Sequence, residues 1–322
     1  MLIEAFQDVL EDLATPEHLR RIESSRSCAH LWNQLTTNGL LELMTDQDRG
    51  GAAMEWRELH AIFVLLGEFG MPAPIAQSIL ARSLLVGMYE VPQEMITIAP
   101  FSETVGAQLR CRNVAFGGRA EYVITQAGSD LVLLFAADAQ RVATGIYHSD
   151  TADLTWSSIK PVFSAPLPSS TLELQSAAMH AALLAGAMSR VLQISLRYVA
   201  DRYQFGKPIG KFQAVQQQMA VMAEHVAAAR IASALAFRSV CTLRGTAVAK
   251  SRTSEAASIV TAIGHAVHGA IGITAEYDLQ LFTRRLHEWR IADGAEDYWN
   301  LKLGELILRK PKPSLAEFAK SL

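Results

Sequence analysis

Apolar residues recur three and four positions apart through the first part of the chain, as at Ala5, Val9 and Leu13. This spacing places them on one face of an α-helix. Prolines and paired glycines interrupt the pattern, so it indicates several helices instead of one. We therefore predict a bundle of about four helices over residues 1–95.

The period of the pattern changes between residues 96 and 170. Short apolar runs are separated there by glycine, aspartate and asparagine, which is typical of strands joined by turns. The runs lie at residues 96–98, 122–125, 131–135 and 142–147. This part of the chain predicts a compact and short β domain.

Helical spacing returns in residues 171–322, where Leu184, Met188 and Val191 follow one face. Further helical stretches cover residues 211–243, 249–268 and 298–309. The order is therefore α, then β, then α. It predicts an α+β fold, mainly α, with three domains bounded at residues 1–95, 96–170 and 171–322.

Composition narrows the classes of partner. Half of the 322 residues are apolar, which is enough to bury a large core. The net charge is -3 and the basic residues are scattered, so neither nucleic acid nor an anionic membrane is expected as a partner. The first residues do not resemble a signal peptide, and no uninterrupted apolar run reaches membrane-spanning length. We therefore expect a cytoplasmic protein.

The three cysteines, Cys28, Cys111 and Cys241, are far apart in the sequence and none forms a CxxC pair. This spacing argues against a disulfide framework and against a zinc site. His265 and His268 stand three apart, as metal ligands on a helix do, yet no third ligand accompanies them at a suitable spacing. We therefore predict free thiols and no metal site.

The stretch at residues 201–213 is the strongest candidate for a ligand-binding site in the sequence. Glycine and proline break one long helix there and begin another, which leaves Arg202 and Lys207 near a helix terminus. A guanidinium group and free backbone N–H groups suit a phosphate or pyrophosphate. A helix–helix turn with solvated charges is the alternative interpretation.

Two further stretches are candidates for chemistry. Gly269 and Gly272 permit close backbone approach to a ligand, or form only a helix end with a turn. Three carboxylates lie within five residues around a glycine, those of Asp293, Glu296 and Asp297. They either form part of a catalytic loop or stabilise the positive end of the next helix.

Three stretches together resemble the acyl-CoA dehydrogenases. DRYQFGKPIGKFQAVQ is similar to that family's Arg-x-Gln-Phe-Gly-x-Pro-Ile-x-x-Phe-Gln signature, and VHGAIGITAEYDLQLFTRR resembles its glycine-rich flavin segment. LWNQLTTNGLLELMTDQDRGGAAMEW resembles its Trp-x-x-Leu-x-x-x-Gly-Leu stretch. The resemblance spans nearly the whole chain and implies a helical domain, a β domain and a C-terminal four-helix domain.

The resemblance also implies an activity. In such enzymes a glutamate removes the α-proton of an acyl-CoA thioester, the β-hydrogen leaves as hydride to FAD, and electron-transferring flavoprotein reoxidises the flavin. Arg202 would contact the FAD pyrophosphate, commonly across a subunit interface, with Phe205 and Gln213 also near the cofactor. The backbone along the flavin nucleotide would come from Ala266, Val267, His268, Gly269 and Ala270. Ala266 stands where the family usually has glutamine.

The position of the base differs from the family pattern. Counted without a gap from the glycine-rich segment, the family's glutamate falls on Asp293, with Glu296 as an alternative. Some members place the base earlier, at a position that Ser176 occupies here, one turn from Glu173. Aspartate is shorter than glutamate by one methylene, and Asp293 still serves as the base if its loop moves inward.

A short β domain and an altered base resemble one subunit of the heteromeric α2β2 bacterial acyl-CoA dehydrogenases, which often act on steroid side chains or other bulky thioesters. Three hypotheses stay open. The chain desaturates an acyl-CoA, alone or in a homo- or hetero-oligomer with a related subunit; or it is a non-catalytic subunit that completes a partner's FAD site; or it is a flavin-dependent monooxygenase, since that fold is shared.

Overall fold

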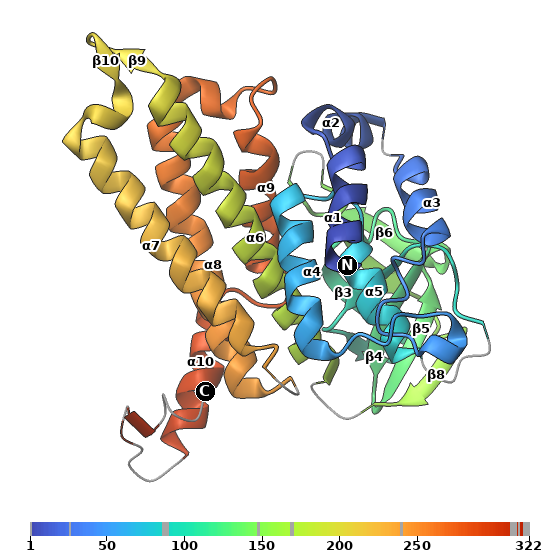
Figure 1. The fold of residues 1–322 in the computed structure, drawn as a ribbon. Helices are drawn as coiled ribbons and strands as arrows, with labels where there is room; N and C mark the ends of the chain where they lie inside the picture. Colours follow the sequence, from blue (N-terminus) through green and yellow to red (C-terminus); the bar gives the residue numbers. More distant parts are fainter. Residues whose placement is uncertain are drawn as a thin grey trace. The chain divides into compact units, whose positions relative to one another are not determined.

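The structure is a computed structural model that describes residues 2–25, 27–85, 90–146, 149–167, 171–238, 241–309, 314 and 316–317 (Figure 1). The chain divides into two compact units. The first contains Met1–Leu59 and Met71–Met179, and the second contains His60–Gly70 and His180–Leu322. The three predicted domain boundaries stay predictions.

Helices occupy the described part of the chain before residue 86. They are α1 (Leu2–Leu13), α2 (Pro16–Ser25), α3 (Ala29–Thr37), the short 3-10 helix η1 (Gln47–Arg49), α4 (Trp56–Phe69) and α5 (Ile75–Leu84). The apolar stripe of α1 buries Phe6 and Leu10. Pro16 occupies the first position of α2, where its fixed φ and missing N–H are tolerated. About four helices were predicted here, and the described residues contain five α-helices.

Two four-stranded sheets make up the β region of the first unit. One has the order β1-β4-β5-β8, formed by β1 (Ile96–Ala99), β4 (Tyr122–Ala127), β5 (Asp130–Phe135) and β8 (Phe163–Pro166). The other has the order β2-β3-β7-β6, formed by β2 (Glu103–Val105), β3 (Gln108–Val114), β7 (Ala152–Trp156) and β6 (Ala139–Ala143). Only β1 and β4 pair in parallel among the described strands, and the other neighbours in these sheets pair antiparallel.

Three of the four predicted apolar runs lie in strands, namely β1, β4 and β5. The fourth, at residues 142–147, was placed too late in the chain, because β6 ends at Ala143. Residue 147 lies outside the described residues. The side chains of β6 are almost all exposed, so no apolar run marks this strand.

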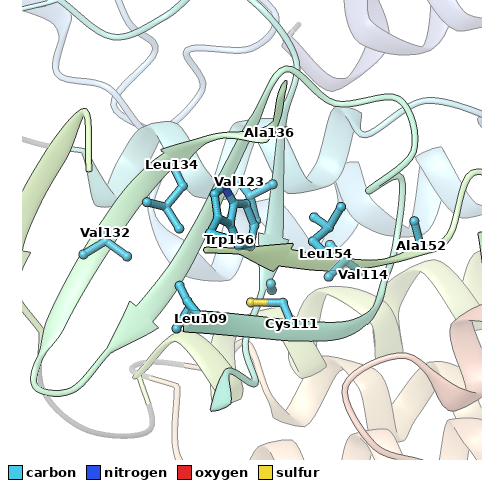
Figure 2. Close-up of a cluster of buried hydrophobic side chains, with 11 residues drawn as sticks. Leu109, Cys111, Val114, Val123, Val132, Leu134, Ala136, Ala152, Leu154 and Trp156 are labelled. Atoms are coloured by element: carbon cyan, nitrogen blue, oxygen red, sulfur yellow. The ribbon is translucent and has the colours of Figure 1, made fainter. Parts of the chain in front are cut away.

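The core of the β region lies between the two sheets (Figure 2). Val123 and Leu134 come from the first sheet, and Leu109 and Leu154 come from the second. Trp156 is almost fully buried, and its indole N–H donates a hydrogen bond to the Phe135 carbonyl at 3.0 Å. A buried indole therefore keeps its polar atom satisfied while its ring fills the space between the sheets.

The second unit is helical. It contains the later parts of α4 and α6 (Thr171–Asp201), and α7 (Gln213–Leu235), α8 (Leu243–His268), α9 (Leu279–Ile291) and α10 (Glu296–Leu308). A two-stranded hairpin of β9 (Tyr203–Gln204) and β10 (Lys207–Pro208) follows α6, and 3-10 helices lie at η3 (Ile209–Lys211) and η4 (Gly269–Ile273). The predicted helix at residues 211–243 includes residues 239–240, which lie outside the described residues.

The mainly α, α+β architecture is confirmed, with a C-terminal helical domain. Within it, α8 begins before the predicted residue 249 because Thr242 caps it, accepting a hydrogen bond from the Gly245 N–H at 3.2 Å. By length and composition alone, α6 and the stretch Leu243–Ile273 are apolar enough to cross a membrane. In α6, 78% of the apolar window is buried inside the protein, as in the core helix of a globular protein.

Two glycines allow α4 and α6 to approach closely within the second unit. A Cβ atom on Gly67 would lie 2.1 Å from the Leu183 carbonyl oxygen, and one on Gly186 would lie 1.9 Å from the Val64 carbonyl oxygen. Real Cβ atoms essentially never come that close to another atom. The two helix backbones are therefore in direct contact at Gly67 and Gly186, which have no Cβ atom.

Candidate functional site

The acidic turn, residues 292–295, joins α9 to α10 and contains two residues in the left-handed region. Asp293 has φ 57° and Gly294 has φ 92°. A Cβ atom on Gly294 would lie 2.4 Å from Cδ1 of Tyr298, so only glycine fits without a shift. Aspartate tolerates positive φ better than most residues, and such backbone outliers concentrate at functional sites.

Asp293 is buried, with 9% of the residue exposed. Its Oδ2 atom lies 2.5 Å from Nδ1 of His180, a residue of α6 that is 2% exposed. The backbone carbonyl of Asp293 accepts a hydrogen bond from the Trp299 indole N–H at 2.9 Å. When the Asp293 carboxylate is ionised, it accepts this hydrogen bond from the Nδ1–H of His180.

Lys250 on α8 donates hydrogen bonds to backbone carbonyls in the acidic turn and just before it. It is fully buried, and its ammonium group donates to the carbonyl oxygens of Arg290 and Gly294, each at 2.8 Å, and to Ser254 Oγ at 3.0 Å. Burial lowers the pKa of Lys250 to about 7, while Asp293 acts in the opposite direction. These hydrogen bonds therefore join α8 to the last turn of α9 and to the acidic turn.

Glu296 begins α10 and pairs with Arg290 of α9. The Arg290 Nε donates to one carboxylate oxygen at 3.0 Å, and its terminal Nη2 donates to the other. These hydrogen bonds lower the pKa of Glu296 and favour its ionised, weakly basic form. This arrangement agrees with the structural interpretation of Glu296.

The hairpin after α6 presents the predicted phosphate-binding group to solvent. Figure 1 shows β9 and β10 at one end of α6. Arg202 and Gln213 are exposed, and Phe205 is 90% exposed with φ 51°. Lys207 lies over the Phe212 ring, 4.3 Å from its centroid. A phenyl group displayed on a strained turn is typical of a surface that contacts a ligand or another chain.

The predicted glycine segment begins where α8 ends. Ala266, Gly269 and Ala270 are exposed, and Val267 is half-buried. Gly269 has φ 62°, and no atom lies within 4 Å of a Cβ built on it, so a ligand could approach this backbone.

His268 connects this segment to the end of α6. Its ring is 4% exposed and stacks on Tyr198, with 4.3 Å between centroids. Its Nδ1–H donates to the Gly264 carbonyl at 2.7 Å, and burial lowers its pKa. The Arg202 N–H in turn donates to the Tyr198 carbonyl at 2.9 Å. The structure therefore brings the hairpin and the glycine segment together.

The two histidines that stand three apart have separate partners. His265 Nε2 lies 3.0 Å from the Thr283 hydroxyl, whereas His268 bonds to its own helix. Among the residues that the structure describes, no group of three or more His, Cys, Asp or Glu side chains could hold a metal ion.

The base candidates and the phosphate-binding candidates lie at different ends of the helices. His180 and Tyr198 are separated along α6, as Lys250 and His268 are along α8, by about 27 Å at ~1.5 Å per residue. Figure 1 shows α10 and the hairpin at opposite ends of α8. The second unit therefore holds two separate groups of candidate residues.

The sequence pattern did not point to His180 or Lys250. His180 lies one helical turn beyond Ser176, the buried residue at the family's alternative base position, so this spacing was the available signal. Lys250 is a lone cation on an otherwise small and apolar helix face.

The comparisons with known proteins agree over nearly the whole chain. The model of the acyl-CoA dehydrogenase C-terminal domain matches residues 170–306. The acyl-CoA dehydrogenase IpdE2 of Mycolicibacterium smegmatis is 32% identical over 302 residues, covering 89% of this chain and 91% of that protein.

Two solved structures share the fold. The ChsE4–ChsE5 complex of Mycobacterium tuberculosis matches with a TM-score of 0.79 at 22% identity, covering 97% of both chains. A variant of the Tcur3481–Tcur3483 steroid acyl-CoA dehydrogenase matches with a TM-score of 0.81 at 23% identity, covering 96% of this chain and 97% of that one.

Proposed function

Because the chain belongs to the acyl-CoA dehydrogenase family, we propose that it takes part in the α,β-desaturation of an acyl-CoA thioester as a flavoprotein. The observation that carries this proposal is the buried acidic turn. An α-proton beside a thioester is weakly acidic, so its removal needs a base held in fixed geometry away from water. Asp293 meets both conditions through its burial and its bonds to His180 and Trp299.

The exposed groups of the second site fit FAD. Arg202 and Lys207 supply positive charge for a pyrophosphate, and Gly269 offers backbone that a ligand can approach. We assign Arg202, Phe205 and Gln213 to cofactor binding, together with the backbone of residues 266–270. FAD, when bound, accepts the β-hydrogen as hydride, and electron-transferring flavoprotein then removes the electrons.

A related subunit completes the enzyme in this proposal. The acidic turn and the hairpin lie about 27 Å apart along the helices, so each suits a different copy of the cofactor site. The exposed Phe205 supports contact of the hairpin with another chain. The ChsE4–ChsE5 structure is itself a complex of two chains, and the Tcur3481–Tcur3483 relative is described as a steroid enzyme. We therefore propose a cytoplasmic hetero-oligomer that acts on a bulky, steroid-derived thioester.

The test compares the chain alone with the chain co-expressed with a related subunit. Flavin content and the bleaching of flavin absorbance are measured with butyryl-CoA, octanoyl-CoA and a steroid-carboxyl-CoA thioester. The proposal expects bleaching that Asp293→Asn abolishes and that Glu296→Gln retains. Bleaching of the complex that Asp293→Asn leaves unchanged would instead identify a non-catalytic subunit. Rapid oxygen consumption by the reduced flavin would indicate a monooxygenase.

A further inference from the structure

The ring of His268 lies between the two stretches that we assign to cofactor binding. His268 is the last residue of α8, directly before Gly269, and its ring stacks on Tyr198 near the end of α6. We propose that the neutral ring of His268 positions the glycine segment against the base of the hairpin, and that protonation of this ring weakens FAD binding. This inference rests on the proposed function. His268 acts in it as a positioning residue, which needs no contact with the ligand.

Two tyrosines pack against the ring and form an aromatic stack with it. Tyr198 stacks on His268 with 4.3 Å between centroids, and the Tyr277 ring lies 5.2 Å away. The two tyrosine rings also contact each other edge to face, with 5.9 Å between centroids. The Tyr198 hydroxyl donates a long hydrogen bond, 3.4 Å, to the His268 carbonyl, because the end of α8 leaves its last carbonyls without intrahelical partners. Tyr198 therefore contacts both the ring and the backbone of His268.

Backbone hydrogen bonds join Tyr198 to the hairpin. The Arg202 N–H donates to the Tyr198 carbonyl at 2.9 Å, and the Ile209 N–H donates to the Arg202 carbonyl at 2.8 Å. The residues at the two ends of the hairpin are therefore bonded to each other and to the turn of α6 that stacks on His268. A displacement of the His268 ring would shift the glycine segment relative to Arg202, whose guanidinium group we assign to the pyrophosphate.

The hydrogen bonds of the ring define its neutral form. His268 Nδ1 lies 2.7 Å from the Gly264 carbonyl oxygen, which only accepts, so the proton of the neutral ring is on Nδ1. Its Nε2 atom is buried and has no hydrogen-bond partner among the residues that the structure describes. Protonation would place a second N–H and a positive charge in a buried position that offers no acceptor, which is unfavourable. The protonated ring relieves this cost by moving toward solvent, away from Tyr198.

The charged groups around the aromatic stack do not reverse this preference. Burial is the largest cause that lowers the pKa of His268 from 6.5, and His265 lowers it further, whereas the bond to Gly264 raises it. The segment η4 (Gly269–Ile273) has no titratable side chain. The other charged groups near the stack act on Tyr277, and they are Arg197 and Asp201 of α6 and Asp278. The neutral ring is therefore the main form at pH 7, and its contribution is lost as the pH falls through the folded pKa, below 6.5.

The decisive variant is His268→Phe, which keeps an aromatic ring for the stack but cannot take up a proton. In the flavin-loaded complex of the full chain with its related subunit, the dissociation constant of FAD is measured by flavin fluorescence from pH 7.5 to pH 5. We expect the wild-type constant to rise by up to about tenfold per pH unit below the pKa of the ring. In His268→Phe the constant should match the wild type at pH 7.5 and change by less than about twofold down to pH 5.

A matched control is His225→Phe, since His225 on α7 bonds to Arg252 and is not part of the aromatic stack. This variant should keep the wild-type dependence on pH. Circular dichroism at each pH checks that every protein stays folded. A wild-type constant that does not change with pH would overturn the inference, and so would a His268→Phe complex that keeps the wild-type slope or loses FAD at pH 7.5. A complex that carries no flavin at neutral pH would instead refute the proposed function.

A second measurement needs neither the variant nor bound flavin. Amide hydrogen exchange of the wild-type full chain is followed by mass spectrometry at pH 7.5 and pH 5, with the rates corrected for the intrinsic effect of pH. The amides of Arg202 and Ile209 are hydrogen-bonded at the base of the hairpin. We expect their protection to fall at pH 5, while the protection of α7 stays constant. Equal protection of these two amides at both pH values would overturn the inference.

Discussion

The contact between α4 and α6 sets a steric limit at residue 186. A Cβ atom there would lie 1.9 Å from the Val64 carbonyl oxygen and 2.8 Å from the Glu68 backbone nitrogen, whereas ordinary contact begins at 3.4 Å. Both obstacles are backbone atoms, so Gly186→Ala forces the helices apart by about 1.5 Å, the difference between 3.4 and 1.9 Å. Overpacking typically costs about 1–3 kcal/mol and the helix preference of alanine returns ~1 kcal/mol. We expect a net loss of up to about 2 kcal/mol in the free energy of unfolding.

The assay is urea and thermal unfolding of the full chain, followed by circular dichroism. Gly304→Ala is the matched control, because Gly304 lies inside α10 with no atom within 4 Å of a built Cβ. The same substitution should stabilise there by about 0.5–1 kcal/mol. An unfolding midpoint for Gly186→Ala at or above that of the wild type would refute the argument from backbone contact.

Three further predictions concern single groups. Because Arg290 lowers the pKa of Glu296 from 4.5, this pair stabilises the fold above that value and loses its effect as pH falls through the folded pKa. Glu296→Gln should therefore lower the free energy of unfolding measured in urea at pH 7 by up to ~1 kcal/mol, and match the wild type in acid. Burial raises the pKa of Cys111 and of Cys241 to about 11, so a thiol reagent at pH 7 should modify both slowly until urea is added. Gly294→Ala should destabilise by about 1–3 kcal/mol because its Cβ meets an aromatic ring of α10, and an unchanged melting temperature would contradict this.

Helices were predictable where an apolar stripe is long. Residues 171–201 and 249–268 carry small and apolar residues at helical spacing over many turns, and α6 and α8 lie there. In the helix α9 charged residues interrupt the apolar stripe, although Arg285 and Trp289 are buried.

Short strands were harder to predict than helices. The strands β2 and β6 expose most of their side chains, and β8 has only four residues, so none produces an apolar run. Strand β3 alternates buried and exposed positions, yet its exposed positions carry arginines that conceal the pattern. Their pairing with distant strands, and not their own composition, decides these elements.

The candidate site was predictable only in part. Counting along the chain led to Asp293, because the glycine-rich segment lies close to it in sequence. Its partner His180 is 113 residues away, and Lys250 reaches the turn from 44 residues away. Each lies on a helix far from the turn in sequence. Only tertiary packing brings it to the turn, so the local sequence pattern does not predict the contact.

Lys250 also decides how the acidic turn can respond to a ligand. Swinging residues 292–295 inward would separate the buried Lys250 amine from one of its three acceptors, the carbonyl of Gly294. Leaving a buried hydrogen-bonding group without its partner costs about 1–3 kcal/mol. The turn is therefore preorganised in the proposed function, and its amide hydrogens should exchange with solvent as slowly before ligand binding as after it.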